Sequence, residues 1–236
     1  MQARTTFRGT AVSYGVKLLV RAKKSKKSLV LLCVLTTFAA SAALDFSAAM
    51  LAKVRAKYGG EGVSRILKWQ TFIESARPLT EMQKLKEVND FFNQQIEFVD
   101  DADLWGMVDY WATPVEFLAQ GAGDCEDYSI AKYFTLRELG VPDKKMRITY
   151  VKAIELNQAH MVLTYFDTPR SIPVVLDNLI PTIKQATKRR DLLPVYSFNG
   201  SGLWLAKARG AGKRVGGSSR LNKWGGLKNR MLTNDL

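Results

Sequence analysis

The 236-residue sequence contains few of the residues that most often form disulfide bonds or bind transition metals, with two cysteines and one histidine. A structural zinc site needs four ligands, mostly of these two types, so that class of site is excluded. Cys33 lies in an apolar segment near the N-terminus, apart from Cys125 and His160. If that segment is removed on export, Cys125 has no partner for an internal disulfide bond.

Acidic residues are absent from the first 43 positions, which carry eight lysines and arginines. The basic stretch RAKKSKKS (21–28) precedes the apolar run LVLLCVLTTFAASAA (29–43), in which Ala40-Ser41-Ala42 fits an A-x-A cleavage site. This order is typical of a secretory signal peptide, and the run is short for a membrane span of about 20 residues. We expect residues 1–43 to be a signal peptide, with an uncleaved anchor as the alternative.

The formal net charge of +13 does not describe the middle of the chain. Residues 44–206 hold 19 basic and 21 acidic residues, whereas the segment from residue 207 onward holds eight basic residues and one acidic residue. The basic excess at the two ends does not predict a nucleic-acid site in the central region. We expect one folded domain at 44–206 and a disordered basic tail, rich in glycine, lysine and serine, at 207–236.

Hydrophobic periodicity predicts an α+β fold for the central region. Apolar residues recur at helical spacing over 45–100, where Thr80 is suited to begin a helix, and a further helix is expected from Cys125 to a stop at Gly140. Three short runs rich in β-branched and aromatic residues follow. These predict neighbouring antiparallel strands at 146–154, 160–166 and 173–179.

Cys125, His160 and Asp177 fall at the start of the predicted helix, the start of the second strand and the end of the third. A cysteine nucleophile needs a base, and that base needs an orienting acceptor. A helix start also favours a thiolate. The same spacing is compatible with a structural strand histidine and a turn aspartate. Asn178 and Asp167 are lesser candidates for the third role.

Three carboxylates, those of Asp124, Glu126 and Asp127, surround Cys125 in the sequence. Negative charge raises the pKa of a thiol and makes it a poorer nucleophile, so the arrangement needs a reason. One interpretation is structural: Asp124 caps the helix, and the other two carboxylates complement its dipole.

Several motifs together resemble the bacterial transglutaminase-like cysteine proteinases, and most of all the LapG-type periplasmic proteases. The resemblance spans about residues 60–205. The segments that carry it are WATPVEFLAQGAGDCEDYSIAKYFTLRELGVP, MRITYVKA, HMVLTYF, VVLDNL and DLLPVYSFNGSGLW. It implies a papain-like or transglutaminase-like fold, a periplasmic location, and a catalytic triad of Cys125, His160 and Asp177.

The resemblance also implies partners and a cofactor. LapG-type enzymes cleave large surface adhesins near their N-terminal anchor, which releases cells from biofilm, and an inner-membrane cyclic-di-GMP receptor sequesters them. They require calcium, and Asp124, Glu126 and Asp127 match the acidic positions beside their cysteine. Ca²⁺ takes about six to eight oxygen ligands. A bound dication would reverse the negative field around the thiol, which answers the question raised by the three carboxylates.

Three other functions compete with calcium-dependent proteolysis. The same triad would support acyl transfer to an amine, the transglutaminase reaction, because both reactions pass through an acyl-enzyme. A non-catalytic scaffold that binds the receptor or the adhesin is the second, and an intact Cys-His-Asp set argues against it. A nucleic-acid binder acting through the basic tail is the third, and export and the near-neutral central region argue against it.

Overall fold

The computed structural model describes residues 46–206 and 212–233, which belong to one compact unit. The predicted signal peptide at 1–43 lies outside the described residues. Within those residues, no helix combines the length and the apolar character that a membrane crossing requires.

The helices begin and end largely where local signals place them. Thr80 caps α2 in a reciprocal capping box with Gln83, as its sequence position predicts. Gly59 takes a left-handed φ of 73° inside α1 and marks a kink there. The described α-helices are α1 (Ala48–Ala76), α2 (Glu81–Gln95), α3 (Asp101–Leu104), α4 (Pro114–Gln120), α5 (Cys125–Glu138) and α6 (Asn222–Thr233), with 3-10 turns at Asp143–Lys145, Ala186–Lys188 and Ser218–Arg220.

A seven-stranded antiparallel sheet in the order β6-β5-β4-β3-β7-β8-β9 forms the second half of the fold. The three predicted strands are confirmed as β3 (Met146–Ala153), β4 (Gln158–Tyr165) and β5 (Val174–Leu176). The others are β6 (Lys184–Gln185), β7 (Leu192–Phe198), β8 (Leu203–Leu205) and β9 (Lys213–Gly216). A separate parallel pair joins β1 (Glu97–Phe98) to β2 (Ala122–Gly123).

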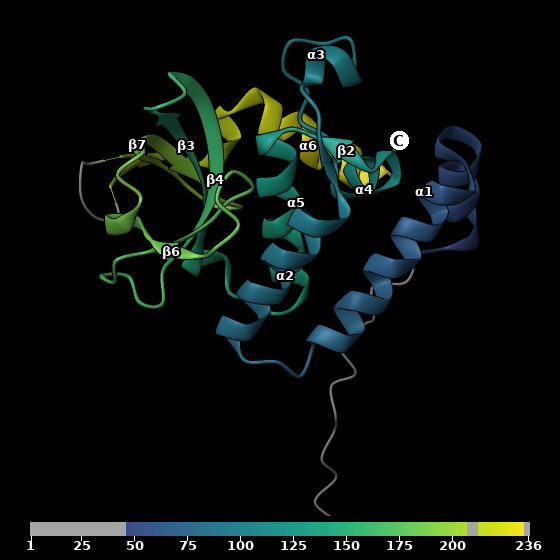
Figure 1. Ribbon diagram of the computed structural model, residues 1–236, viewed down its shortest axis with the longest axis horizontal. Helices are drawn as coiled ribbons and strands as arrows, with labels where there is room; N and C mark the ends of the chain where they lie inside the picture. The colour runs from purple at the N-terminus through teal and green to yellow at the C-terminus, as the bar shows by residue number, and fades with distance from the viewer. Residues whose placement is uncertain (1–45, 207–211, 234–236) are drawn as a thin grey trace, which may run out of the picture. The chain divides into compact units, whose positions relative to one another are not determined.

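The core lies where α5 packs between the sheet and the other helices (Figure 1). Ile130 and Leu136 of α5 are fully buried, as are Leu163 of β4 and Phe92 of α2. Burying one such side chain contributes roughly 1.5–3 kcal/mol to stability. The helix that begins at Cys125 is therefore held on two sides, and this fixes its first turn against β4.

The expectation of a disordered tail is wrong for residues 212–233. These residues form β9, which pairs with β8, and α6, whose Trp224 and Leu227 are fully buried. The Trp224 ring stacks on Phe134 of α5 with 5.4 Å between ring centroids. The basic, glycine-rich composition concealed a narrow apolar stripe of Trp224, Leu227 and Met231 at helical spacing, which is enough to dock one helix face.

Candidate active site and carboxylate cluster

The parallel pairing of β1 with β2 brings two distant segments together at the start of α5. Glu97 pairs with Ala122 and Phe98 with Gly123, and the N–H of Val99 donates to the Gly123 carbonyl at 3.0 Å. Because both strands run in the same direction, the residues that follow each of them emerge side by side. The acidic residues after β1 therefore meet the acidic residues after β2.

Gly123 is required at this junction by the closeness of its neighbours. A Cβ atom at this position would lie 2.5 Å from Asp127 Oδ2 and 2.6 Å from the Phe117 ring. Both contacts are shorter than side-chain packing permits, so a larger residue would displace the carboxylate or the ring. The glycine two positions before the cysteine thus lets the first turn of α5 close against α4.

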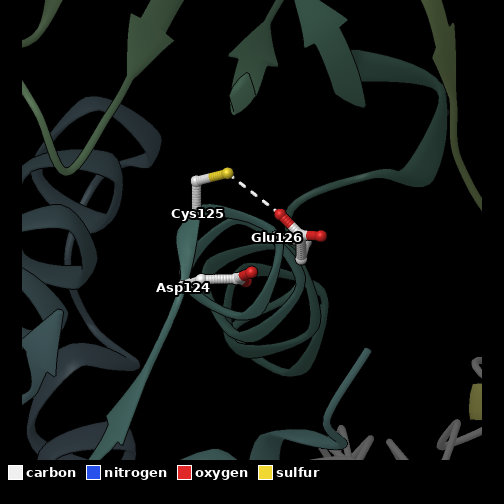
Figure 2. A group of neighbouring side chains, drawn as sticks. All are labelled: Asp124, Cys125 and Glu126. Carbon is white, nitrogen blue, oxygen red and sulfur yellow. Dashed lines mark hydrogen bonds between the residues drawn. The ribbon is translucent and has the colours of Figure 1, made fainter. Parts of the chain in front are cut away.

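Cys125 is the first residue of α5 and its thiol is partly buried. Its Sγ–H donates to Glu126 Oε2 at 2.9 Å, and Figure 2 shows these two side chains facing each other, with Asp124 extending across the same turn. Burial raises the pKa of the Cys125 thiol well above its usual value, and the charges of Glu126 and Asp124 raise it further. In the absence of a bound cation, the thiol is therefore held in its protonated form.

His160 of β4 and Asp177, which follows β5, form a buried pair. The distance between His160 Nε2 and Asp177 Oδ1 is 2.8 Å, and the two residues are 5% and 2% exposed. Burial alone would raise the pKa of Asp177, but the hydrogen bonds from His160 and Arg189 lower it to about 2. An ionised carboxylate only accepts hydrogen bonds, so Nε2 carries the proton and donates it. An imidazole that carries its one proton on Nε2 has Nδ1 as its acceptor.

A pocket of about 380 Å³ joins the thiol and the imidazole. Cys125 and His160 both line it, together with Glu126 from the first turn of α5 and Tyr150 from β3. Its apolar lining includes Phe98, Val108, Leu156 and Leu179. Its polar lining includes the acidic residues Asp100, Asp109 and Asp124. The pocket therefore combines a thiol and a ring nitrogen with walls that are partly apolar and partly acidic, and a peptide segment can be held there by both kinds of contact.

Three buried carboxylates gather at the start of α5, and one of them, Asp124, also lines the pocket. Asp101, Asp124 and Asp127 each place one oxygen within 4.8 Å of those of the other two. Each also has one buried oxygen, Oδ1 of Asp101 and Asp124 and Oδ2 of Asp127, without a hydrogen-bond partner among the described residues. A buried oxygen without a partner is costly, and three in one place fit a hard cation. A second acidic group consists of Asp101, Asp109 and Glu126.

The electrostatics of the cluster follow from crowding and burial. Burial, followed by the charges of Glu126 and Asp127, raises the pKa of Asp124. Burial likewise raises the pKa of Asp127 well above its usual value, although the Ala112 N–H donates to its Oδ1 at 2.8 Å and opposes the shift. Like charges this close cannot all ionise without a compensating positive charge.

The structure brings together some of the residues expected from the sequence and separates others. Asp124 occupies the N-cap position of α5 but its side chain makes no capping hydrogen bond, so the capping interpretation is wrong. The Asp167 carboxylate lies 3.7 Å from Lys145 Nζ, and the ring of His160 pairs with Asp177 instead. Sequence reasoning missed Asp101, whose only signal was its place in the acidic run DDAD at 100–103.

A model of the bacterial transglutaminase-like cysteine proteinases matches residues 70–198. The chain belongs to this cysteine proteinase family. Among solved structures, calcium-bound LapG from Legionella pneumophila is 45% identical with a TM-score of 0.66, covering 79% of this chain and 99% of that one. EGTA-treated LapG from the same organism is 44% identical with a TM-score of 0.67, covering 77% and 97%. No curated protein sequence matches significantly.

These relatives confirm the predicted fold class. The mixed arrangement of helices and antiparallel sheet is that of the transglutaminase-like cysteine proteinases. The part of the chain that the family model matches includes α5 and β4, which carry Cys125 and His160, and β5, which Asp177 directly follows.

Proposed function

We propose that this member of the cysteine proteinase family is an exported, calcium-dependent endopeptidase with Cys125, His160 and Asp177 as its catalytic residues. The observation that carries the proposal is the buried 2.8 Å bond between His160 and Asp177, beside a pocket that Cys125 and His160 both line. A structural histidine would not need to share a pocket with the only described cysteine.

The proposed reaction uses these groups in two stages. His160 Nδ1 accepts the proton of the Cys125 thiol, and the thiolate attacks the peptide carbonyl carbon. As the C–N bond breaks, the imidazolium returns that proton to the leaving amine, which leaves an acyl-thioester. His160 then accepts a proton from water, whose oxygen attacks the thioester. The C–S bond then breaks, the peptide acid departs, and the imidazolium returns the proton to the thiolate, which restores the thiol and the neutral ring. Asp177 keeps the ring in one orientation throughout.

Calcium is proposed as the cofactor because the carboxylate cluster needs a cation and calcium-bound LapG is a relative. Asp101, Asp124 and Asp127 would hold the ion, with Glu126 close enough to contribute. Bound there, Ca²⁺ would supply positive charge beside the helix that carries the thiol. Mg²⁺ fits less well, because it demands tighter octahedral geometry and gives up its water reluctantly.

The proposed substrate is a large cell-surface adhesin, cut near its N-terminal anchor so that cells leave the biofilm. An inner-membrane cyclic-di-GMP receptor is the proposed partner that sequesters the enzyme in the periplasm. Both proposals rest on the family resemblance. The pocket, whose walls are partly apolar and partly acidic, supports a protein substrate in general, since a peptide segment can enter it.

The testing experiment mixes the protein without its leader with an N-terminal fragment of a large adhesin from the same organism. One discrete cut is expected in the presence of calcium. No cut is expected with excess EGTA or with Cys125→Ala, which changes little packing at a helix start. Crosslinking to an added amine in place of a cut would favour acyl transfer, and cleavage by Cys125→Ala would refute the assigned nucleophile.

A further inference from the structure

Arg189 is a buried arginine on the side of Asp177 that faces away from His160. It lies directly after the 3-10 turn Ala186–Lys188 and is 3% exposed. Its Nη2 donates to Asp177 Oδ2 at 2.7 Å. The same guanidinium is held by Asp191, through Nη2–Oδ2 at 2.7 Å and Nε–Oδ1 at 3.0 Å. One cation therefore bridges two carboxylates, and its Nη2 atom donates to both.

The two oxygens of Asp177 have different partners. Oδ1 accepts from His160 Nε2 at 2.8 Å and from the Leu179 N–H at 3.1 Å, whereas Oδ2 accepts from Arg189. A rotation of the carboxylate that moved Oδ1 away from the ring would break bonds on both oxygens together. The planar fork of an arginine defines such an orientation better than a lysine, whose ammonium acts as a point charge.

A buried ion pair by itself is weak support for stability, since desolvation offsets much of its attraction. The Arg189 network is better explained by what it orients. The Asp191 carboxylate, which is one quarter exposed, holds the guanidinium, and the guanidinium holds a carboxylate that is fully out of solvent. The contacts therefore run from Asp191 at the surface through Arg189 and Asp177 to the His160 imidazole.

We propose that Arg189 is a positioning residue of the protease reaction, which fixes the Asp177 carboxylate so that Oδ1 faces His160. The inference rests on the proposed function, because it assumes that the orientation of His160 matters to Cys125. Asp191 acts one step further out by holding Arg189. The lowered pKa of Asp177 agrees with this role, since an ionised carboxylate must persist inside the fold.

The test uses two readouts that need no peptide substrate. His160 is the only histidine in the sequence, so the imidazole ¹⁵N signals of tag-free protein report its tautomer without ambiguity. The rate at which iodoacetamide alkylates Cys125, measured against pH in calcium-containing buffer, reports how well the ring assists the thiol. A Cys33→Ser background or removal of the leader makes Cys125 the only thiol. His160→Ala sets the unassisted rate.

The variants are Arg189→Met, Arg189→Lys and the neighbouring control Arg190→Met, which removes an exposed arginine from the same turn. Arg189→Met is expected to reduce the neutral-pH alkylation rate at least about tenfold, the loss typical of one charge-assisted hydrogen bond, and to produce a mixture of tautomers. Arg189→Lys should restore part of the rate, and Arg190→Met should leave it unchanged. In an Asp177→Asn background, Arg189→Met should reduce the alkylation rate of Cys125 by less than about twofold, because the carboxylate that Arg189 positions is already gone.

Two results would overturn the inference. One is wild-type alkylation and a single tautomer in folded Arg189→Met. The other is a full, additive loss when Arg189→Met is combined with Asp177→Asn. If Arg189→Met fails to fold, Arg189→Lys decides, since a positioning role predicts a reduced rate at an unchanged melting temperature. A wild-type rate no greater than that of His160→Ala would instead refute the proposed function itself.

Discussion

Asp101→Asn is expected to have opposite effects on stability with and without calcium. In the calcium-free protein, burial raises the pKa of Asp101 to about 6, with further contributions from Glu126 and Asp109, although the Tyr110 N–H lowers it. A carboxylate whose pKa is higher in the folded than in the unfolded chain destabilises the fold where it is ionised. The cost is present at neutral pH and disappears as the pH falls through 6 toward 4.

The size of the calcium-free effect follows from the rise of the Asp101 pKa from 3.8 to about 6, which corresponds to at most about 3 kcal/mol. Asparagine keeps an oxygen for the Tyr110 N–H and carries no charge, so the substitution should relieve much of the repulsion. For a domain of this size, 1 kcal/mol moves the melting temperature by about 2–4 °C. Asp101→Asn should therefore melt several degrees higher than wild type in excess EGTA at pH 7.

The calcium-bound effect has the opposite sign. Calcium at about 100 times its dissociation constant adds about 2.7 kcal/mol to wild type, or roughly 5–11 °C. A neutral oxygen in place of a carboxylate weakens the site, and a loss of affinity of about thirtyfold would reduce that increment to about 0.9 kcal/mol. The calcium-induced rise in melting temperature should thus shrink sharply in Asp101→Asn.

Thermal unfolding in EGTA and in a calcium series, followed by circular dichroism, measures both effects. Asp103→Asn is the matched control, because it removes an exposed carboxylate from the same short helix α3. Asp103→Asn should change neither the melting temperature in EGTA nor the calcium-induced rise by more than about 1 °C. If Asp101→Asn melts lower than wild type in EGTA yet keeps the full calcium-induced rise, Asp101 is a structural residue and the proposed cation site is wrong.

Three further predictions concern the proposed catalytic histidine, the C-terminal helix and a buried lysine. His160→Ala should reduce proteolysis at least about a thousandfold at an unchanged melting temperature, since no second histidine exists; a parallel loss of folding would indicate a structural role. Trp224→Ala should cost about 3–5 kcal/mol in urea unfolding, because the ring is fully buried, whereas exposed Lys223→Ala should cost less than 1. Burial lowers the pKa of Lys132 to about 7, so the unfolded chain binds more protons between pH 7 and 10 and wild-type stability should rise with pH there. Lys132→Met should not show that rise in stability with pH. A stability profile against pH identical to that of wild type would show that Lys132 is not the group responsible.

Sequence reasoning succeeded where local signals act over a few residues. The Thr80 capping box, the start of α5 at Cys125 and the three strands that carry or precede His160 and Asp177 each depend on side chains and backbone within one element. Such signals are readable because capping and hydrophobic periodicity follow directly from residue order. They were sufficient for the fold class, which the family comparison confirms.

The tertiary structure alone decided which distant residues meet at the site. Asp101 joins Asp124 and Asp127 only because β1 pairs in parallel with β2. Arg189 reaches Asp177 only because the pairing of β6 with β5 brings the turn that precedes β7 alongside β5. The neighbouring sequence does not set either residue apart. Asp101 lies among other aspartates and Arg189 lies beside other basic residues, as exposed side chains of the same types commonly do. The C-terminal segment at 212–233 shows a different kind of error, because there the sequence composition gave a prediction that the structure contradicts. Its charge and glycine content predicted disorder, and the burial of Trp224 against α5 overrode that composition, because helical stability in proteins comes mostly from packing one apolar face.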